Sequence, residues 1–341
     1  MQLHRYEGMV QGMLMRRYKR FLADVVLQRE GGAADLEATV VHCPNTGSME
    51  GLLDRPGDTA ALCSIHTGSN RKYVHTLEAL RPGGPGSAWV GVHAALANCM
   101  VRAALEGGVL EQQVGLFSEL QPEVKFGAGG KSRVDFMLTR PAQPGRPPVM
   151  AYLEVKSVTL AEPHVDRPGT SIALFPDTVS ERAQRHVTDL MSAAASGHDA
   201  LCVFLIQRGD CDRFAPDWLR DPTYAQLLGE AAAAGVVCVA LRCELTPDGA
   251  GGAAFTFLGM ADVDLEYRRE EGLALLASAA ALKGAGKGGG ARKAKPKAKA
   301  AGTTASLAGG EGGGSGAALE GGGGGGSSGQ VLTARGKRAR K

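Results

Sequence analysis

Two stretches decide the fold of this chain: Arg133-Val-Asp-Phe136 and, after a loop rich in Pro and Gly, Tyr152-Leu-Glu-Val-Lys156. Both are short apolar runs of strand type, and alternate residues of a strand lie on the same face of a sheet. Glu154 and Lys156 are therefore predicted to share one face, while Val155 points into the opposite layer. If the two stretches pair as a hairpin, Asp135 comes alongside Glu154.

Two carboxylates and one ammonium in this arrangement suit a divalent cation and a phosphate group. A hard cation such as Mg²⁺ takes oxygen ligands from a few carboxylates plus substrate phosphate, so Asp135 and Glu154 are the candidate metal ligands. Lys156 would orient an attacking water or offset charge on the phosphate. The pattern is that of the PD-(D/E)xK nuclease core, with Val134 in place of the Pro. A Glu-x-Lys on an exposed strand face is also commonly a solvated ion pair, so both interpretations stay open.

Blocks of sequence along most of the chain resemble a known family, and they occur in that family's order from about Arg16 to Ala240. The blocks are Arg17 to Val25, His42 to Met49, Glu123 to Lys125, Arg133 to Phe136, Glu154 to Thr159, Phe175 to Asp177, and Glu181-Arg182 with Gln184 and His186. They resemble the signature blocks of the sugar fermentation stimulation protein A family. The resemblance implies DNA binding, an N-terminal OB-type barrel and a nuclease-like domain. The biochemical role of that family is poorly defined.

The same resemblance adds a fourth candidate catalytic residue. Gln184 matches a Gln that follows the family's Glu-Arg pair, and it is expected to face the metal and position substrate. His186 matches a neighbouring His, although it is equally a solvated helix residue. The chain departs from the family at Ala103, where the first helix of the family carries a Glu, and Glu106 is a possible substitute. Function therefore stays open between a Mg²⁺-dependent phosphodiesterase acting on nucleic acid, a non-catalytic DNA-binding regulatory protein, and a housekeeping protein with another ligand.

The first region predicts a small β domain of five short apolar strands separated by turn clusters. The expected strands are Arg20 to Leu27, Leu36 to Cys43, Thr59 to Ile65, Tyr73 to Leu80 and Ala88 to His93. Five strands fit a Greek-key barrel that offers a groove to oligonucleotides. The candidate nucleic-acid contacts are Arg17, Lys19, Arg20, Arg71 and Lys72, with Arg182 from the later helix, although each is also a plausible solvated charge. His42 to Met49 is expected to turn, with free N–H groups that form either an anion site or a tight turn alone.

The second region predicts a helix, a hairpin, a second helix and a buried strand, which together favour a mixed sheet. The expected elements are a helix at Ala94 to Leu105, strands at Val124 to Leu138 and Met150 to Val158, a helix at Thr178 to Ala195 and a strand at Ala200 to Gln207. The predicted fold class is α/β (α+β): an OB-like barrel over 1–85, a PD-(D/E)xK nuclease-like domain over 86–265, and a disordered basic tail over 283–341.

The charge is distributed unevenly along the chain. The net charge is +3, and the tail over 283–341 carries twelve Lys and Arg against two Glu, which leaves −7 for residues 1–282. Gly, Ala and Lys dominate the tail, a composition that cannot bury enough apolar surface to order itself. Such an arm either lies along a nucleic-acid backbone by releasing counterions or only keeps the protein in solution. Its final residues, 337–341, are alternatively a nuclear import signal.

The cysteines and the apolar pattern bear on location. None of the seven cysteines forms a C-x-x-C pair, and several lie in apolar runs, which is typical of reduced thiols. No stretch of eighteen apolar residues exists, so no transmembrane helix is expected. The first residues include an acid and lack the apolar run of a signal peptide. We therefore expect an intracellular protein in a reducing compartment, cytoplasmic or nuclear and not secreted, with DNA as its partner.

Overall fold

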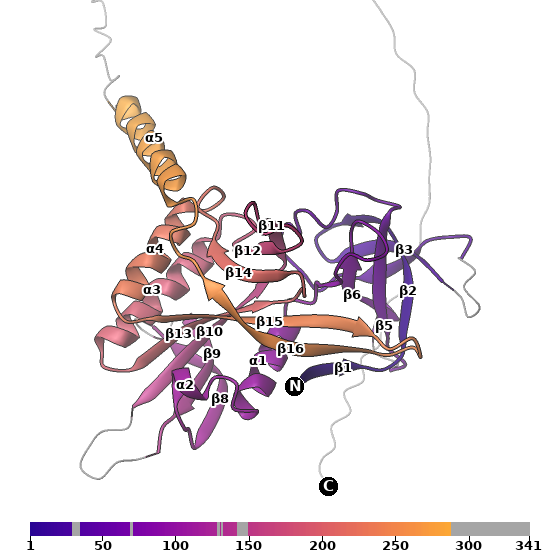
Figure 1. Ribbon diagram of the computed structural model, residues 1–341, viewed down its shortest axis with the longest axis horizontal. Helices are drawn as coiled ribbons and strands as arrows, with labels where there is room; N and C mark the ends of the chain where they lie inside the picture. Colours follow the sequence, from indigo (N-terminus) through magenta and orange to yellow (C-terminus); the bar gives the residue numbers. More distant parts are fainter. Residues whose placement is uncertain (29–34, 69–70, 128–129, 131, 142–148, 288–341) are drawn as a thin grey trace, which may run out of the picture. The chain divides into compact units, whose positions relative to one another are not determined.

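The protein is described by a computed structural model that covers residues 1–28, 35–68, 71–127, 130, 132–141 and 149–287. Within these residues the strands form two sheets, one of six strands and one of ten (Figure 1). The smaller sheet forms the N-terminal barrel. The larger sheet carries the helices and most of the remaining chain.

The barrel is closed by five strands. It is built from β2 (Met9–Tyr18), β3 (Leu22–Leu27), β4 (Thr39–His42), β5 (Thr59–Ile65) and β6 (His75–Arg81), with the short β7 (Val90–Gly91) added at one edge. The strand order is β4-β3-β2-β5-β6-β7, and β4 also pairs with β6 through His42 and Thr76, which closes the ring. Its interior is filled by apolar side chains such as Leu14, Val25 and Leu77. The predicted OB-type barrel is confirmed.

One barrel strand, β2, precedes the first strand that the sequence predicts. Lys19 and Arg20 form the turn between β2 and β3, with positive φ angles of 50° and 63°. Gly12 allows β2 to lie close to β3, because a Cβ at this position would lie 2.6 Å from the backbone oxygen of Val26. The run of β2 is a weak strand signal in the sequence because Gln, Gly and two Arg interrupt its apolar residues.

The larger sheet mixes parallel and antiparallel pairs, as predicted. Its strands are β1 (Gln2–Tyr6), β8 (Glu119–Phe126), β9 (Ser132–Thr139), β10 (Met150–Val158), β11 (Leu160–Pro163), β12 (Ser171–Phe175), β13 (Asp199–Ile206), β14 (Cys211–Pro216), β15 (Val237–Pro247) and β16 (Ala253–Val263). The order is β11-β12-β14-β16-β15-β13-β10-β9-β8, and β1 pairs with β16. The central strands β10, β13 and β15 are parallel, whereas β8, β9 and β10 are antiparallel.

The central strand β13 is buried on both faces, which explains its continuous apolar sequence. Leu201, Val203 and Leu205 lie in the core that also contains α1 (Leu96–Glu106) and α2 (Glu111–Val114). Cys202 and Phe204 lie in the core on the other face, with α3 (Glu181–Ala195) and α4 (Pro222–Ala233). The alternation along one strand therefore separates two helical layers, and Figure 1 shows α3 and α4 side by side.

The helices α3 and α4 begin at polar caps that contact each other. The hydroxyl of Ser180 accepts the Ala183 N–H at 3.2 Å, and the carboxylate of Asp221 accepts the Tyr224 N–H at 2.9 Å. Such caps satisfy N–H groups that the first helical turn leaves free. Asp221 also accepts the Ser180 N–H at 2.9 Å, so one carboxylate joins the starts of both helices.

The end of the described chain is a helix, α5 (Arg269–Lys287), so residues 283–287 of the predicted tail are helical. The rest of that tail, 288–341, lies outside the described residues. The boundaries 1–85 and 86–265 stay a prediction, and the pairing of β1 with β16 places residues 2–6 in the larger sheet. Among the helices of the described residues, none combines the length and apolar character needed to cross a bilayer. All seven cysteines are free thiols.

Candidate functional site

Strands β9 and β10 bring Asp135 and Glu154 together, as the spacing predicts. Their antiparallel register pairs Leu153 with Phe136. The pairing of the two strands ends there, and the next residues on them, Asp135 and Glu154, both line one cavity. The sheet therefore places the two carboxylates on neighbouring strands at the edge of the β9–β10 ladder.

The Asp135 carboxylate is held from two directions. Its Oδ2 accepts the Val155 N–H at 2.7 Å. Its Oδ1 accepts a hydrogen bond from the side-chain amide of Asn98, on α1, at 2.7 Å. Each carboxylate oxygen has two lone pairs, so both oxygens keep one free for a further ligand.

Glu154 lies in a buried cluster of charged and ring groups on the α3 face of β10. Its Oε1 accepts a hydrogen bond from the Lys156 ammonium at 2.7 Å and also contacts Nδ1 of His186. Glu154, Lys156 and His186 are only 5%, 8% and 7% exposed. Within the described residues no group hydrogen-bonds Oε2 of Glu154. The contacts of Oε1 therefore fix the carboxylate, while Oε2 stays available for a ligand.

The two carboxylates differ in their affinity for a proton. Burial raises the pKa of Asp135, and the negative charge of Glu154 raises it further. Burial also acts to raise the pKa of Glu154, but Lys156 and His186 outweigh it and hold this pKa below its usual value. The unfavourable charge on Asp135 is the effect that a cation between the two groups would relieve.

A cavity of about 310 Å³ lies at this cluster, between the larger sheet and the barrel. Its barrel side is formed by the loop after β4, and its sheet side by β9, β10 and the segment between β12 and α3. The polar lining residues are Asn45, Thr46, Asp135, Glu154, Lys156, Ser157, Thr159, Asp177 and Arg182. Predicted residues Asp135, Glu154, Lys156 and Arg182 thus share one cavity.

Three predicted basic contacts lie at the β2–β3 end of the barrel. Arg17 is tied to the cavity loop, because its guanidinium donates to the backbone oxygen of Asn45 at 2.7 Å and to that of Arg20 at 3.0 Å. The side chains of Lys19 and Arg20 are exposed in the turn that follows β2. Arg17 therefore contacts the cavity loop, and none of the three residues lines the cavity.

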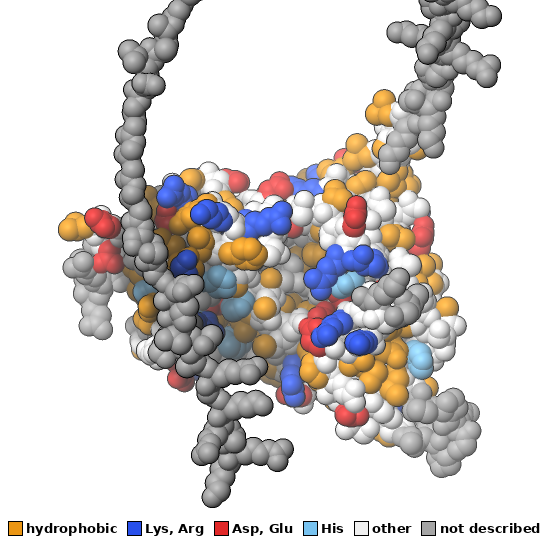
Figure 2. All heavy atoms as spheres, turned by 180° about the vertical axis from the view of Figure 1, so that it is seen from behind, with side chains coloured by type: hydrophobic (Ala, Val, Ile, Leu, Met, Phe, Trp, Pro, Cys, Tyr) orange, Lys and Arg blue, Asp and Glu red, His pale blue; other side chains and the backbone are white. Residues whose placement is uncertain are grey.

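Arg71 and Lys72 line a second cavity, of about 380 Å³, on the barrel. It also contains His42 and His93. In Figure 2 several histidine side chains lie together in a hollow of the displayed face, and Lys and Arg side chains lie on both sides of it. The basic residues predicted as nucleic-acid contacts therefore divide between two cavities and one turn.

Gln184 faces away from the carboxylate pair. Its side-chain amide donates to both oxygens of Asp221, at 2.9 and 3.2 Å. Asp221 is the residue that caps α4 and binds the Ser180 N–H. Gln184 thus supports the start of α3, and through it the helix that carries His186 and Arg182.

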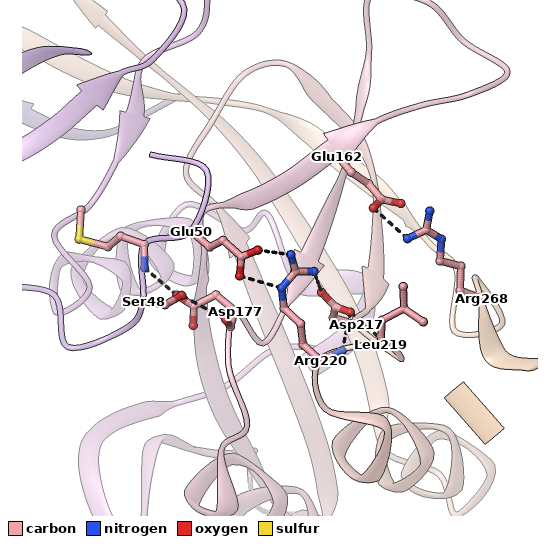
Figure 3. A network of polar contacts seen from close by, with 9 residues as sticks. Ser48, Glu50, Glu162, Asp177, Asp217, Leu219, Arg220 and Arg268 are labelled. Carbon is pink, nitrogen blue, oxygen red and sulfur yellow. Dashed lines mark hydrogen bonds and ion pairs between the residues drawn. The ribbon is translucent and has the colours of Figure 1, made fainter. Parts of the chain in front are cut away.

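The loop after β4 is fastened to the sheet side of the cavity by Asp177. The Asp177 carboxylate accepts the Met49 N–H at 3.0 Å and the Ser48 hydroxyl at 2.9 Å (Figure 3). At Gly47 a Cβ would lie 2.8 Å from this carboxylate, so any larger residue there would displace the Asp177 side chain. The free N–H predicted in this loop therefore binds an anion, and that anion is the chain's own Asp177.

A second connection lies beside it. The Arg220 guanidinium donates to Glu50 at 2.9 Å and to Asp217 at 2.6 Å (Figure 3). Glu50 belongs to the same loop as Met49, and Asp217 follows β14. The loop is consequently held from two segments of the larger sheet on one side of the cavity.

Sequence reasoning underestimated His186 and did not identify Asn98 or Asp177 as site residues. A signal for His186 was present, because Ala183, His186, Val187 and Leu190 follow the i, i+3, i+4, i+7 spacing of a buried helix face. Asp177 contacts a residue 128 positions away, which a single sequence does not reveal.

The donor set fits a partly hydrated cation. Among the described residues, no group of three or more His, Cys, Asp or Glu side chains is arranged to hold a metal ion. Two carboxylates with free lone pairs suit an ion such as Mg²⁺, which keeps several water ligands. The possible substitute Glu106 pairs with Arg102 at 2.8 Å on the exposed surface of α1, and it is Asn98 of that helix that reaches Asp135.

The fold defines the class: this is a two-part protein in which an OB-type barrel is joined to a mixed α/β sheet that carries two carboxylates at the edge of the β9–β10 ladder. Two family models match the chain: the SfsA N-terminal OB domain over residues 15–92 and the sugar fermentation stimulation protein RE domain over residues 95–249. The chain therefore belongs to the sugar fermentation stimulation protein family, and the predicted family is confirmed.

Individual relatives agree with this assignment. The chain is 39% identical over 263 residues to a sugar fermentation stimulation protein homolog of Cyanothece sp., which covers 77% of this chain and 98% of that protein. It is 40% identical over 237 residues to the homolog of Shewanella baltica, covering 70% and 91% of the two chains. The solved structure of Pyrococcus furiosus SfsA in complex with Ca²⁺ shares the fold, with a TM-score of 0.62, 23% identity, and coverage of 77% and 99%.

Proposed function

We propose that this chain binds nucleic acid and cleaves its phosphodiester bonds with the help of a divalent cation. The observation that carries the proposal is the meeting of Asp135, Glu154 and Lys156 in one cavity that is bounded by the barrel. OB-type barrels commonly offer a groove to oligonucleotides, and carboxylates with a lysine are the groups that phosphodiester chemistry needs. In this proposal the barrel binds the nucleic-acid strand, and Asp135, Glu154 and Lys156 act on its phosphodiester bonds.

Asp135 and the free Oε2 of Glu154 are the proposed cation ligands. A bound divalent cation supplies positive charge to a phosphate oxygen. The relative from Pyrococcus furiosus was solved with Ca²⁺, which like Mg²⁺ is a hard cation that prefers oxygen ligands. For this chain we propose Mg²⁺, because the site offers few protein ligands and leaves room for water and substrate.

The remaining groups act on the substrate or hold the site. The Lys156 ammonium offsets charge that develops on the phosphate, and the exposed Arg182 at the cavity contacts a neighbouring phosphate. His186 fixes Glu154 through Oε1. Gln184 positions α3 through Asp221.

DNA is the proposed partner. The exposed Lys19 and Arg20, together with Arg71 and Lys72, provide positive charge on the barrel, and exposed cations on such a surface attract a phosphate backbone. The basic residues over 288–341 would add to this attraction in a salt-dependent manner.

A non-catalytic DNA-binding protein is the second candidate. The first observation in its favour is that Lys156 and His186 both contact Glu154, so the charge of Glu154 is compensated within the fold. The absence of a carboxylate at Ala103 points the same way. In that case the cavity provides shape and charge without turnover.

The experiment that separates the candidates combines cleavage and binding. Purified protein is incubated with single- and double-stranded DNA and with Mg²⁺ or Mn²⁺, and EDTA serves as the stop. Lys156→Ala should abolish cleavage and keep DNA binding, whereas Lys125→Ala, an exposed residue of β8, should keep both. Binding without any cleavage by the wild type would replace the enzyme with the DNA-binding protein, and the lack of both would reject the proposal.

A further inference from the structure

All but one of the side chains that line the second cavity can donate a hydrogen bond to a ligand; the exception is Thr76, whose hydroxyl already donates to Nε2 of His66 at 2.9 Å. Its lining residues are His42, Arg71, Lys72, Tyr73, Thr76 and His93. A guanidinium and an ammonium can only donate hydrogen bonds, and imidazole rings and hydroxyl groups can also donate. No carboxylate is among these six residues, so the pocket is built for an acceptor that carries negative charge.

His93 is oriented from behind by a buried carboxylate. Its Nδ1 lies 2.8 Å from Oε2 of Glu78, and Glu78 is only 2% exposed. The hydroxyl of Tyr6 donates to the same oxygen at 2.8 Å, and that of Ser64 donates to the other at 2.6 Å. Because Nδ1 is engaged with Glu78, Nε2 is the ring nitrogen of His93 that a ligand can contact.

Arg71 is positioned without being neutralised. Its guanidinium lies 3.1 Å from Nε2 of His66, and this nitrogen must accept because a guanidinium only donates. Burial, and then the charge of Arg71, lower the pKa of His66, which agrees with a neutral ring. Lys72 lies over the ring of Tyr73, 5.4 Å from its centroid. No carboxylate of the described residues forms an ion pair with Arg71 or Lys72, so both positive charges remain for a ligand.

The pocket and the cavity of Asp135 and Glu154 are adjacent along two chain segments. Ala94, which lines the cavity, directly follows His93, and Asn45, which also lines it, comes three residues after His42. The two segments are bonded together, because the Asn45 amide donates to the backbone oxygen of Val92 at 2.9 Å. A ligand in the pocket therefore lies next to the cavity.

We infer that this pocket binds a phosphomonoester, and specifically the terminal phosphate of a nucleic-acid strand, an inference that rests on the proposed function. An internal phosphodiester offers two free oxygens and one negative charge. A terminal phosphate offers three acceptor oxygens and nearly two charges, which is the better match for the unpaired cations Arg71 and Lys72 together with the donor groups of His42, Tyr73 and His93. The strand would enter the cavity from its phosphorylated end.

The test compares oligonucleotides that differ only at their ends. Fluorescence anisotropy in EDTA measures binding of one single-stranded sequence with a 5′-phosphate, a 3′-phosphate or hydroxyl ends. A phosphorylated end should bind about 10-fold more tightly than the hydroxyl form, and inorganic phosphate should compete this advantage away. Lys72→Gln and His93→Gln should each remove most of the preference, while Lys125→Gln on β8 should keep it. Thermal melting checks that each variant is folded.

The outcomes separate the inference from the function on which it rests. Equal affinity for the three oligonucleotides, or a full preference in a folded Lys72→Gln variant, overturns the pocket and leaves nucleic-acid binding in place. If no oligonucleotide binds, the proposed function fails. Calorimetry with inorganic phosphate and with a mononucleotide then decides between a pocket for a free phosphomonoester and no pocket at all.

Discussion

Lys156 and His186 contact the same oxygen of Glu154, which brings Nζ of the lysine to within 3.5 Å of Nδ1 of the histidine. Two residues of β10 and one of α3 are thereby joined in a buried group. The arrangement fixes the rotamer of Glu154 and decides which of its oxygens faces the cavity. The contribution of this buried group to stability can be measured by replacing either Lys156 or His186.

Replacing His186 should destabilise the fold. In His186→Ala, the buried Glu154 keeps Lys156 but loses a second partner, and leaving a buried charged group less satisfied costs about 1–3 kcal/mol in unfolding free energy. Urea denaturation measures this loss. Arg185→Ala, an exposed neighbour on α3, should change stability by less than about 0.5 kcal/mol. Equal effects of the two substitutions would contradict the role of His186.

Divalent cations should stabilise the wild type through Asp135 and Glu154. Millimolar Mg²⁺ or Ca²⁺ should raise the melting temperature, because a ligand that binds only the folded state shifts unfolding by mass action. Asp135→Asn and Glu154→Gln should lose this shift. Asp166→Asn, which changes an exposed carboxylate outside the cavity, should retain it. A wild type whose melting temperature and calorimetric titration do not respond to either cation would remove the metal from the site.

The loop after β4 should depend on Asp177. Asp177→Ala removes the acceptor of the Met49 N–H, a loss of about 0.5–1.5 kcal/mol, while the Ser48 hydroxyl keeps only the backbone oxygen of residue 177 at 3.1 Å. Hydrogen exchange followed by mass spectrometry should show faster exchange in the peptide that contains Met49. Peptides from β13, in the centre of the sheet, should be unchanged. Unaltered protection of the loop would mean that Glu50 and Arg220 suffice to hold it.

The stability of the barrel should depend on pH through Glu78. Burial acts to raise the pKa of Glu78, but His93, Ser64 and Tyr6 outweigh it and hold the pKa below the ordinary value of 4.5. Because the folded pKa is the lower one, Glu78 stabilises the fold above about pH 4.5, and this contribution is lost as pH falls through the folded value.

Glu78→Gln should therefore be less stable than the wild type at pH 7, and the difference should shrink as the pH approaches 3. Urea unfolding at several pH values gives both curves. Glu37→Gln, at an exposed position, serves as the control and should follow the wild type throughout. A constant difference between Glu78→Gln and the wild type across this range would exclude the carboxylate as its cause.

The carboxylate pair was predictable because it depends on local geometry. A strand alternates its side chains, and two strands joined through one loop pair with a register that hydrophobic burial restricts. These two facts place Glu154 and Lys156 on one face of β10 and bring Asp135 onto the neighbouring strand. The buried alternation of β13 was equally visible as an unbroken apolar run.

The other parts of the site depend on contacts between segments that are distant in sequence. Asp177 reaches the loop of Met49, and Gln184 turns toward Asp221 because the caps of α3 and α4 meet. Nothing in the local pattern around Gln184 distinguishes a partner at the cavity from a partner on the next helix. In the sequence Glu78 is likewise a single acid in an apolar strand. Only the fold brings Tyr6, Ser64 and His93 around it.

The pairing of β1 with β16 has a consequence for how the protein is made. The chain begins in the larger sheet, leaves it after Tyr6 to build the barrel, and returns to it at α1, so the barrel is an insertion with both ends anchored in the same body. Every barrel strand has been synthesised once Gly91 is added to the chain, whereas β1 must wait for residues 253–263 before it finds its partner. The barrel can therefore fold early during translation, and the last strand of the sheet then captures the first residues of the chain.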